Sequence, residues 1–418
     1  MAEITVVLAG VHGHGWWHLR NLRRLQGLGR VRLAGVCDLV PAAPELLEGF
    51  DALVQSPSLT EVLELTEPDI VVIATPIHTH ADLALVAARA GVHILLEKPP
   101  APTLAGYRRI VDGVRAAGVA CQVGFQSLGS GAVARAAELV RSGEIGAVRG
   151  ISAAGAWHRD STYYDRARWA GHRTLDGVDV VDGALTNPFA HALATALRVD
   201  GSESDDLGSE VELELWHAYD IDSDDTSCLR LLTSRGTTIT VAVTLCAPDR
   251  NEPYLVLHGD RGRAVLWYTR DVLEIEPTAT EEGTARRPSV VPGADGSSAA
   301  VVPDERVDLL ENLAAHLVDR EVPLLVPLSA TRAFMHAVEA VRLAPAPRPI
   351  PRRFLEITPV PDAGVEAESR IVPGVVELVA ASADRLALFS ELGVDWAQAE
   401  PGGTPDRHGQ RARDGVTG

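Results

Sequence analysis

The chain has 418 residues, and its 38 Lys and Arg against 57 Asp and Glu give a formal charge of −19. Its 46% of hydrophobic residues exclude disorder of the whole chain and allow two or three domains. Because an acidic chain repels phosphate backbones and anionic lipid, we expect neither nucleic acid nor a membrane as the main partner, and a small molecule instead.

The first 125 residues alternate between predicted strands and helices. A continuous apolar run at 4–10 is a predicted buried strand, and a glycine-rich loop and a helix at 16–28 follow it. Further predicted strands at 31–37, 68–76, 93–96 and 120–124 are interleaved with helices at 81–90 and 103–117. This pattern predicts the α/β class, with a doubly wound parallel sheet of the Rossmann type over 1–125.

The loop after the first strand indicates a dinucleotide site. Gly10 and Gly15 occupy the outer places of a G-x-G-x-x-G pattern, and the loop also contains His12, Gly13 and His14. A glycine loop at a helix N-terminus presents backbone N–H groups and a positive dipole end to a pyrophosphate. The alternative is a purely structural turn, since glycines often separate strands from helices.

Asp38 strengthens the dinucleotide interpretation. It follows the second predicted strand, where a carboxylate accepts both adenosine ribose hydroxyls of NAD and repels the 2′-phosphate of NADP. We therefore expect NAD as the cofactor, in preference to NADP.

Lys98 is the only lysine in the chain, and every other basic residue except histidine is arginine. A guanidinium stays charged and presents a rigid fork, whereas an ammonium is compact and its pKa moves readily. Retention of one lysine therefore indicates a site that needs an ammonium, the alternative being survival by chance.

Over about residues 4–345, the chain resembles the glucose–fructose oxidoreductase, inositol dehydrogenase and MocA (Gfo/Idh/MocA) family, and two segments carry the resemblance. They are Ala74-Thr75-Pro76-Ile77-His78-Thr79-His80 and the run that ends in Glu97-Lys98-Pro99. The resemblance implies an NAD(P)-dependent oxidoreductase acting on a CH–OH group of a sugar, cyclitol or sugar derivative. It also implies a homo-oligomer, a dimer or tetramer formed through the second-domain sheet, and further cofactor-binding residues: Thr75, Pro76, His78, His80, Glu97, Lys98 and Gln126.

The pattern changes after residue 125. A predicted helix at 131–142 precedes strands near 148–155, 210–217, 228–233, 237–247 and 254–258, joined in part by short turns. Helices are expected at 304–319 and 329–342, and loops at 201–209 and 276–304. These elements predict an α+β domain over 126–345 with a large, mainly antiparallel sheet. We expect an arm with one helix at 346–400 and a disordered tail at 401–418.

The resemblance places the second half of the active site in the segment from Asp182 to His191. It implies that Lys98 lies near the nicotinamide and the substrate hydroxyl, and that His191 takes or gives the proton. Asn187 stands where the family has aspartate, so a neutral amide would orient the substrate or the imidazole. A spacing of four would put Asn187 and His191 on one helical face. Alternatively, Asn187 caps a helix with Pro188 at its first position, and His191 is a core histidine.

Five side chains between 158 and 172 are candidates for sugar binding. Aromatic faces suit the C–H surface of a pyranose, and ring nitrogens and phenols bind hydroxyls, although the same residues could simply pack between domains. They are His158, Tyr163, Tyr164, Trp169 and His172.

Neither a metal nor an extracellular location is expected. The His12/His14 and His78/His80 pairs have no carboxylate or thiolate spaced to complete a tetrahedral site, and the four cysteines form no CxxC pair. The first residues contain no basic segment or cleavage site, and no stretch approaches 18 apolar residues. We expect a cytoplasmic protein.

Two other functions use the same fold. Bound NAD could oxidise and re-reduce a sugar around an elimination, hydrolysis or epimerisation step without net redox change. A non-catalytic NAD-binding sensor or regulator is the third hypothesis, but a sensor needs neither Lys98 nor His191.

Overall fold

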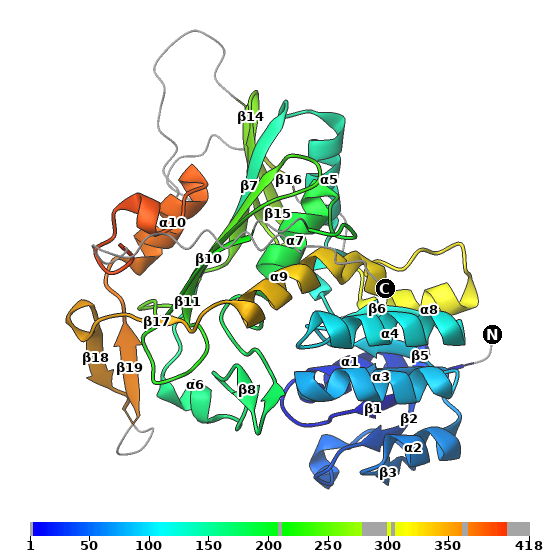
Figure 1. Ribbon diagram of the computed structural model, residues 1–418. Coiled ribbons are helices and arrows are strands. Elements are labelled where there is room, and N and C mark those ends of the chain that lie inside the picture. The colour runs from blue at the N-terminus through cyan, green and yellow to red at the C-terminus, as the bar shows by residue number, and fades with distance from the viewer. Residues whose placement is uncertain (1–2, 208–210, 278–298, 302–305, 362–366, 399–418) are drawn as a thin grey trace, which may run out of the picture.

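The structure is a computed structural model that describes residues 3–207, 211–277, 299–301, 306–361 and 367–398. Two sheets organise it, a six-stranded sheet built from the first third of the chain and a nine-stranded sheet built from the rest (Figure 1). Most of the loop expected at 276–304, and all of the tail expected at 401–418, lie outside the described residues.

The six-stranded sheet is parallel, with the order β3-β2-β1-β4-β5-β6. This confirms the predicted doubly wound sheet, to which the structure adds a short edge strand, β3. The strand order reverses between β1 and β4, and ligands of such folds bind beyond the carboxyl ends of the strands at that point. The strands are β1 (Ile4–Ala9), β2 (Val31–Cys37), β3 (Val54–Ser56), β4 (Ile70–Ile73), β5 (His93–Leu96) and β6 (Cys121–Val123).

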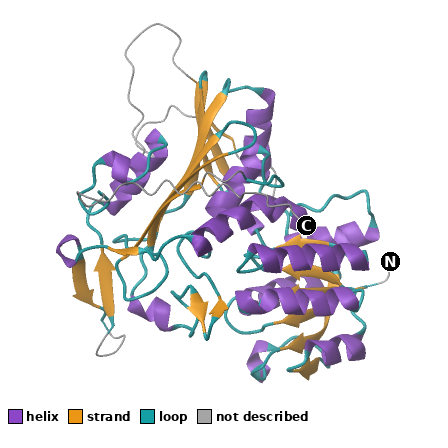
Figure 2. Ribbon diagram, viewed as in Figure 1, coloured by secondary structure: helices purple, strands orange, loops and turns teal. Residues whose placement is uncertain are grey.

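Helices cover both faces of this sheet (Figure 2). On one face, α2 (Leu59–Thr66), α3 (His80–Arg89) and α4 (Leu104–Ala117) lie side by side. On the other face, α1 (Gly15–Gly27) lies beside α8 (Leu309–Val318), and the Asn21 side chain donates to Asp308, the N-cap residue of α8, over 2.9 Å. The sheet interior is apolar, and all four residues of β4 are buried.

The nine-stranded sheet has the order β16-β15-β14-β13-β7-β12-β11-β10-β17. Its pairs are antiparallel except β7 with β12 and β10 with β17, which confirms the predicted large, mainly antiparallel sheet. The strands are β7 (Val148–Ala156), β10 (Val211–His217), β11 (Thr226–Leu232), β12 (Thr238–Thr244), β13 (Tyr254–Gly259), β14 (Gly262–Trp267), β15 (Val272–Pro277), β16 (Ala299–Val301) and β17 (Arg348–Pro349).

The central strand β7 is covered on both faces. Ile151 and Ala153 face the core that includes α5 (Gly131–Ser142) and α7 (Ala190–Asp200), whereas Ala154 faces α10 (Val375–Arg385). Because side chains alternate along a strand, both helical layers are needed to bury β7. Helix α9 (Arg332–Leu343) packs beside α4 and α7 and links the two halves of the molecule.

The arm from residue 346 contains more than the one helix expected. It adds β17 to the sheet edge, forms a hairpin of β18 (Glu356–Pro359) and β19 (Glu368–Ile371), and then places α10 on β7 and β12. Phe389 and Trp396 complete a second apolar core on that face. The predicted homo-oligomer stays a prediction, and a partner would have to bind away from the strands that the arm covers.

No helix in the described ranges combines the length and apolar character needed to cross a bilayer.

Candidate active site

Two glycines of the loop between β1 and α1, Gly10 and Gly15, pack too closely against backbone to accept a side chain. A Cβ on Gly10 would lie 2.8 Å from the Ala74 carbonyl, and one on Gly15 would lie 1.9 Å from the Gly10 carbonyl oxygen. Gly10 also has a φ of +87°, which favours glycine. No described side chain caps the N-terminus of α1. The first three amides of α1 donate to carbonyls of the loop, so a pyrophosphate would lie against the loop itself, at the positive end of the helix dipole.

Asp38 lies beside this loop at the end of β2. Its Oδ2 accepts hydrogen bonds from the Val11 amide (2.8 Å) and His12 Nδ1 (3.0 Å), and its Oδ1 accepts one from the Val40 amide (3.1 Å). Burial alone would raise the pKa of Asp38, but these hydrogen bonds lower it. An ionised carboxylate at the end of β2 fits a ribose diol.

His80 connects the two motif segments rather than facing outward. It is buried, and its Nε2 and Nδ1 lie 2.8 Å and 2.9 Å from the carbonyl oxygens of Thr75 and Pro99. Burial lowers the pKa of His80. Thr75 also pairs with Thr79 through their hydroxyls (2.6 Å), and half-buried His78 follows Pro76 in a turn of 3-10 helix at Ile77–Thr79. His80 is thus suited to position the loop of Glu97 and Lys98.

Glu97 is a buried hub at the end of β5. Its Oε1 accepts from His18 Nε2 (2.8 Å) and Gln126 Nε2 (2.9 Å), and its Oε2 accepts from the Lys98 amide (3.1 Å). Burial would raise the pKa of Glu97, but hydrogen bonds with His14 and His18 bring it well below its usual value. His18 was missed by the sequence analysis, although its spacing of four from His14 on α1 was a usable signal.

His12 and His14 each lie beside a carboxylate that sequence spacing did not indicate, Asp38 at 3.0 Å from His12 and Glu97 at 3.4 Å from His14. The ligand atoms of His14, His18 and Glu97 all lie within 4.8 Å of one another. The carboxylate comes from a different strand end, so sequence spacing could not reveal it. Glu97 is already satisfied by three protein donors, and the absence of a metal stays a prediction.

Lys98 is held by the residue that replaces the family's aspartate. Its Nζ donates to the side-chain oxygen of Asn187 (2.7 Å) and to the Asn187 carbonyl (3.0 Å). The Asn187 amide in turn donates to Asp182 Oδ1 (2.6 Å), whose other oxygen accepts from Arg166 (3.1 Å) and the Gly171 amide (2.8 Å). Burial lowers the pKa of Lys98, against the opposing charges of Glu97 and Asp182.

His191 is the second residue of α7. Its Nδ1 lies 3.1 Å from Ser127 Oγ, which also accepts from Thr195 (3.0 Å), and the Phe125 ring lies edge-on at 5.5 Å. Burial, followed by the Lys98 charge, lowers the pKa of His191 to about 3. The imidazole is therefore neutral near pH 7.

Both helical interpretations of Asn187 are wrong. Helix α7 begins at Ala190 with Phe189 as its N-cap residue, so Asn187 and Pro188 lie in the preceding turn. The Asn187 side chain binds Lys98 and Asp182 and therefore neither caps α7 nor shares a helical face with His191.

The five candidate sugar-binding residues separate into two groups. Tyr163 and Trp169 lie against the Arg166 guanidinium, at 3.7 Å and 4.8 Å from their ring centres, and so belong to the Lys98 network. The others contact protein groups elsewhere: His158 Nδ1 lies 3.0 Å from the Ala247 carbonyl, Tyr164 packs on Tyr219 at 5.0 Å, and His172 Nδ1 lies 3.0 Å from Asp222. For Tyr164 the packing alternative fits better.

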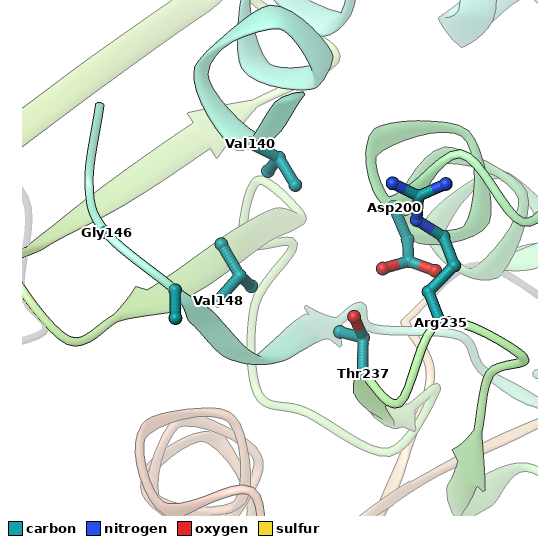
Figure 3. A pocket seen from close by; sticks show the side chains of 7 residues that line it. Val140, Gly146, Val148, Asp200, Arg235 and Thr237 are labelled. Atoms are coloured by element: carbon teal, nitrogen blue, oxygen red, sulfur yellow. The ribbon is translucent and has the colours of Figure 1, made fainter. Parts of the chain in front are cut away.

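A cavity of about 430 Å³ lies apart from these residues (Figure 3). It contains Asp200, at the opposite end of α7 from His191, a separation of about 14 Å along the helix axis. It is therefore not the candidate active site. Its lining residues are Val140, Gly146, Ala147, Val148, Asp200, Arg235 and Thr237.

Two family profiles match the chain. "Oxidoreductase family, NAD-binding Rossmann fold" matches residues 4–125, and "GFO/IDH/MocA C-terminal domain" matches residues 133–265. In fold, the chain resembles the WlbA dehydrogenase from Bordetella pertussis, solved with NADH and UDP-GlcNAcA. That likeness has a TM-score of 0.64 and 22% identity, and it covers 81% of this chain and 95% of the other.

Curated relatives match over shorter stretches. The scyllo-inositol 2-dehydrogenase (NAD(+)) of Bacillus subtilis is 31% identical over 147 residues, and levoglucosan dehydrogenase of Pseudarthrobacter phenanthrenivorans is 32% identical over 144 residues. Each match covers 34% of this chain, and they span 42% and 35% of those relatives. The two profiles, which match both domains, together with these relatives establish that the chain belongs to the Gfo/Idh/MocA family of oxidoreductases.

Proposed function

We propose that this protein is an NAD-dependent oxidoreductase that transfers hydride between a sugar, cyclitol or sugar-derivative carbon and nicotinamide. The observation that carries the proposal is the convergence of the only lysine, Lys98, with a neutral histidine, His191, from the second domain. Relatives named as dehydrogenases of scyllo-inositol and levoglucosan support the substrate class.

The residues that would hold NAD are those of the glycine loop, from Gly10 to Gly15, together with Asp38 and Thr75. The glycines that exclude a Cβ, placed at the positive end of the α1 dipole, fit a pyrophosphate. When bound, NAD supplies the hydride acceptor. Glu97 lies 3.4 Å from His14 of the loop and accepts a hydrogen bond from Gln126, so Glu97 and Gln126 would support the nicotinamide end.

His191 would act as the proton acceptor. An imidazole that donates Nδ1–H to Ser127 leaves Nε2 free to accept the proton of the substrate hydroxyl. Ser127 is then a positioning residue that selects the tautomer, with Thr195 fixing its hydroxyl in turn.

Lys98 would hold the same substrate oxygen and stabilise the negative charge that develops as its proton leaves. Asn187 accepts two hydrogen bonds from the Lys98 Nζ and so fixes the position of the ammonium. Asp182, which accepts a hydrogen bond from the Asn187 side chain, provides a negative charge behind it. Since Nζ has three donors, one is available for substrate.

Cofactor choice is expected to follow Asp38. NAD should bind at least about tenfold more tightly than NADP, or about 1.4 kcal/mol, because the ionised carboxylate would face the 2′-phosphate. Isothermal titration calorimetry with both nucleotides measures the two Kd values, and Asp38→Ser should bring them closer together. Equal or tighter NADP binding would contradict the assignment of Asp38.

The acidic limb of kcat/KM should lie below the usual range of histidine. With a pKa of about 3, His191 stays unprotonated as pH falls from 7.5 to 5.5, whereas an ordinary histidine base would lose about tenfold in rate at pH 5.5. Initial rates across this range, at saturating NAD, provide the test. A rate that falls tenfold with an apparent pKa near 6.5 would contradict a neutral His191 with a lowered pKa.

The deciding experiment is a screen of sugars, cyclitols and sugar acids with NAD and NADP in parallel, followed by NADH absorbance. Stoichiometric NADH release supports the dehydrogenase. Conversion of substrate without NADH release would favour the alternative in which bound NAD returns to its initial state.

A further inference from the structure

Guanidinium groups and aromatic rings alternate over residues 157–169, and Arg250 joins them from the loop between β12 and β13. Arg250 lies 4.7 Å from the centre of the Trp157 ring, and Arg159 lies 5.1 Å from Trp157 and 5.0 Å from Tyr163. Arg166 continues the series with Tyr163 and Trp169. We call this set the arginine ladder: Arg250, Trp157, Arg159, Tyr163, Arg166 and Trp169.

The three arginines of the ladder differ in their partners. Arg166 forms an ion pair with Asp182, at 3.1 Å. Arg159 donates to the carbonyl of His158 (2.8 Å), and within the described ranges neither Arg159 nor Arg250 forms an ion pair. In a chain with a net charge of −19, Arg159 and Arg250 contact one indole, and neither guanidinium has a described carboxylate paired with it, although acidic residues adjoin both in sequence.

The ladder adjoins the proposed catalytic residues. Arg166 is connected to Lys98 through Asp182 and Asn187 by three consecutive hydrogen bonds of 3.1, 2.6 and 2.7 Å. At the other end, the Trp157 ring packs on Phe189 at 4.5 Å, two residues beyond Asn187. Arg159 and Arg250 are therefore linked to the turn that holds Lys98 through the aromatic rings of the ladder.

We propose that the substrate carries an anionic group, a carboxylate or a phosphate ester, which Arg159 and Arg250 bind. The planar guanidinium fork pairs with both anions through two parallel hydrogen bonds. Stacking on Trp157 and Tyr163 orders the two long side chains in advance and so lowers the entropic cost of binding. The inference rests on the proposed function, because the anion is assigned to the same substrate that meets Lys98 and His191.

The test compares substrates that differ mainly in the charged group. NAD reduction is measured with glucose and myo-inositol as neutral substrates, glucuronate and galacturonate as carboxylates, and glucose 1-phosphate and UDP-glucose as phosphate esters. We expect kcat/KM for at least one anionic class to exceed that of glucose by about a hundredfold or more. The class that reacts distinguishes the carboxylate from the phosphate.

Arg159→Gln and Arg250→Gln provide the second arm of the test. Each should raise KM for the anionic substrate about tenfold or more and change values for neutral substrates less than threefold, because only the charge pair is lost. Arg353→Gln is the matched control, since Arg353 stacks on Phe354 at 4.6 Å in the arm. It should leave all these values unchanged.

The outcomes separate this inference from the proposed function. If neutral substrates react as well as anionic ones and both ladder variants behave like the parent, the inference is overturned while the dehydrogenase stands. If nothing in the panel reduces NAD, calorimetric titration of glucuronate and UDP-glucose into the NAD-saturated protein decides. Binding that weakens tenfold in Arg159→Gln retains the anion site without the reaction, and no binding at 10 mM rejects it.

Discussion

Replacement of Lys98 by arginine should lower kcat by about a hundredfold or more while NAD binding stays within about threefold. Asn187 holds the ammonium through two acceptors at 2.7 and 3.0 Å, which leaves one N–H for substrate in a fixed direction. A guanidinium is larger, presents a planar fork and cannot lose its proton near neutral pH, so it cannot reproduce this geometry.

Stopped-flow measurement of the hydride step and titration of NAD would separate chemistry from cofactor binding in this variant. Lys98→Met should lose the same activity, because it keeps the length of the side chain without the charge. If Lys98→Arg turns over within a few fold of the parent, Lys98 has only a structural role and the proposed mechanism is wrong.

Asn187→Asp should lower the free energy of unfolding by about 2 kcal/mol at pH 8, even though aspartate is the family's residue at this position. In the parent, the Asn187 amide donates to Asp182 over 2.6 Å. The substitution replaces that donor with an oxygen and places two carboxylates in contact, which raises the pKa of one of them. The loss of unfolding free energy should therefore shrink as pH falls, because the carboxyl with the raised pKa then binds a proton and can donate a hydrogen bond again.

The reciprocal exchange Asp182→Asn with Asn187→Asp should recover most of this loss. The amide at 182 then donates to the carboxylate at 187, and its oxygen still accepts from Arg166 and the Gly171 amide. Chemical denaturation of the parent, both single variants and the double variant gives a coupling energy, which we expect to be about 1.5 kcal/mol or more. Additive losses in the double variant would show that the two side chains do not interact.

Sequence patterns predicted the fold class and most of its long elements because these depend on local signals, although α2, β14 and β15 were missed. Buried β-branched runs mark the parallel strands, and the glycine loop marks the first crossover. Short strands such as β3 and β17 escaped prediction because three or two residues carry no periodicity. The hairpin of β18 and β19 was missed for a similar reason, since each strand has four residues.

The candidate site was harder to predict because its partners come from distant parts of the chain. Lys98 was recognisable by composition, but its contact with Asn187 spans 89 positions and no local spacing encodes it. A spacing of four predicts that Asn187 and His191 share one helical face, but helix α7 begins only at Ala190, after Pro188 and Phe189. The contacts of Ser127 with His191 and of Asp182 with Asn187 likewise became evident only once the fold had brought these residues together.

The placement of α10 on β7 has a consequence for synthesis of the protein on the ribosome. The last residue of β7 is Ala156 and the first of α10 is Val375, so 219 positions separate two elements that share one core. At a translation rate of roughly 5 to 20 residues per second, about 10 to 45 s pass between the synthesis of β7 and the synthesis of α10, which covers it. During that interval the outer face of the central sheet is exposed, including Cys228, Ala242 and Cys246. Nascent chains would therefore be vulnerable to aggregation until the last tenth of the chain is made, and a slowly translated message should increase the demand for chaperones.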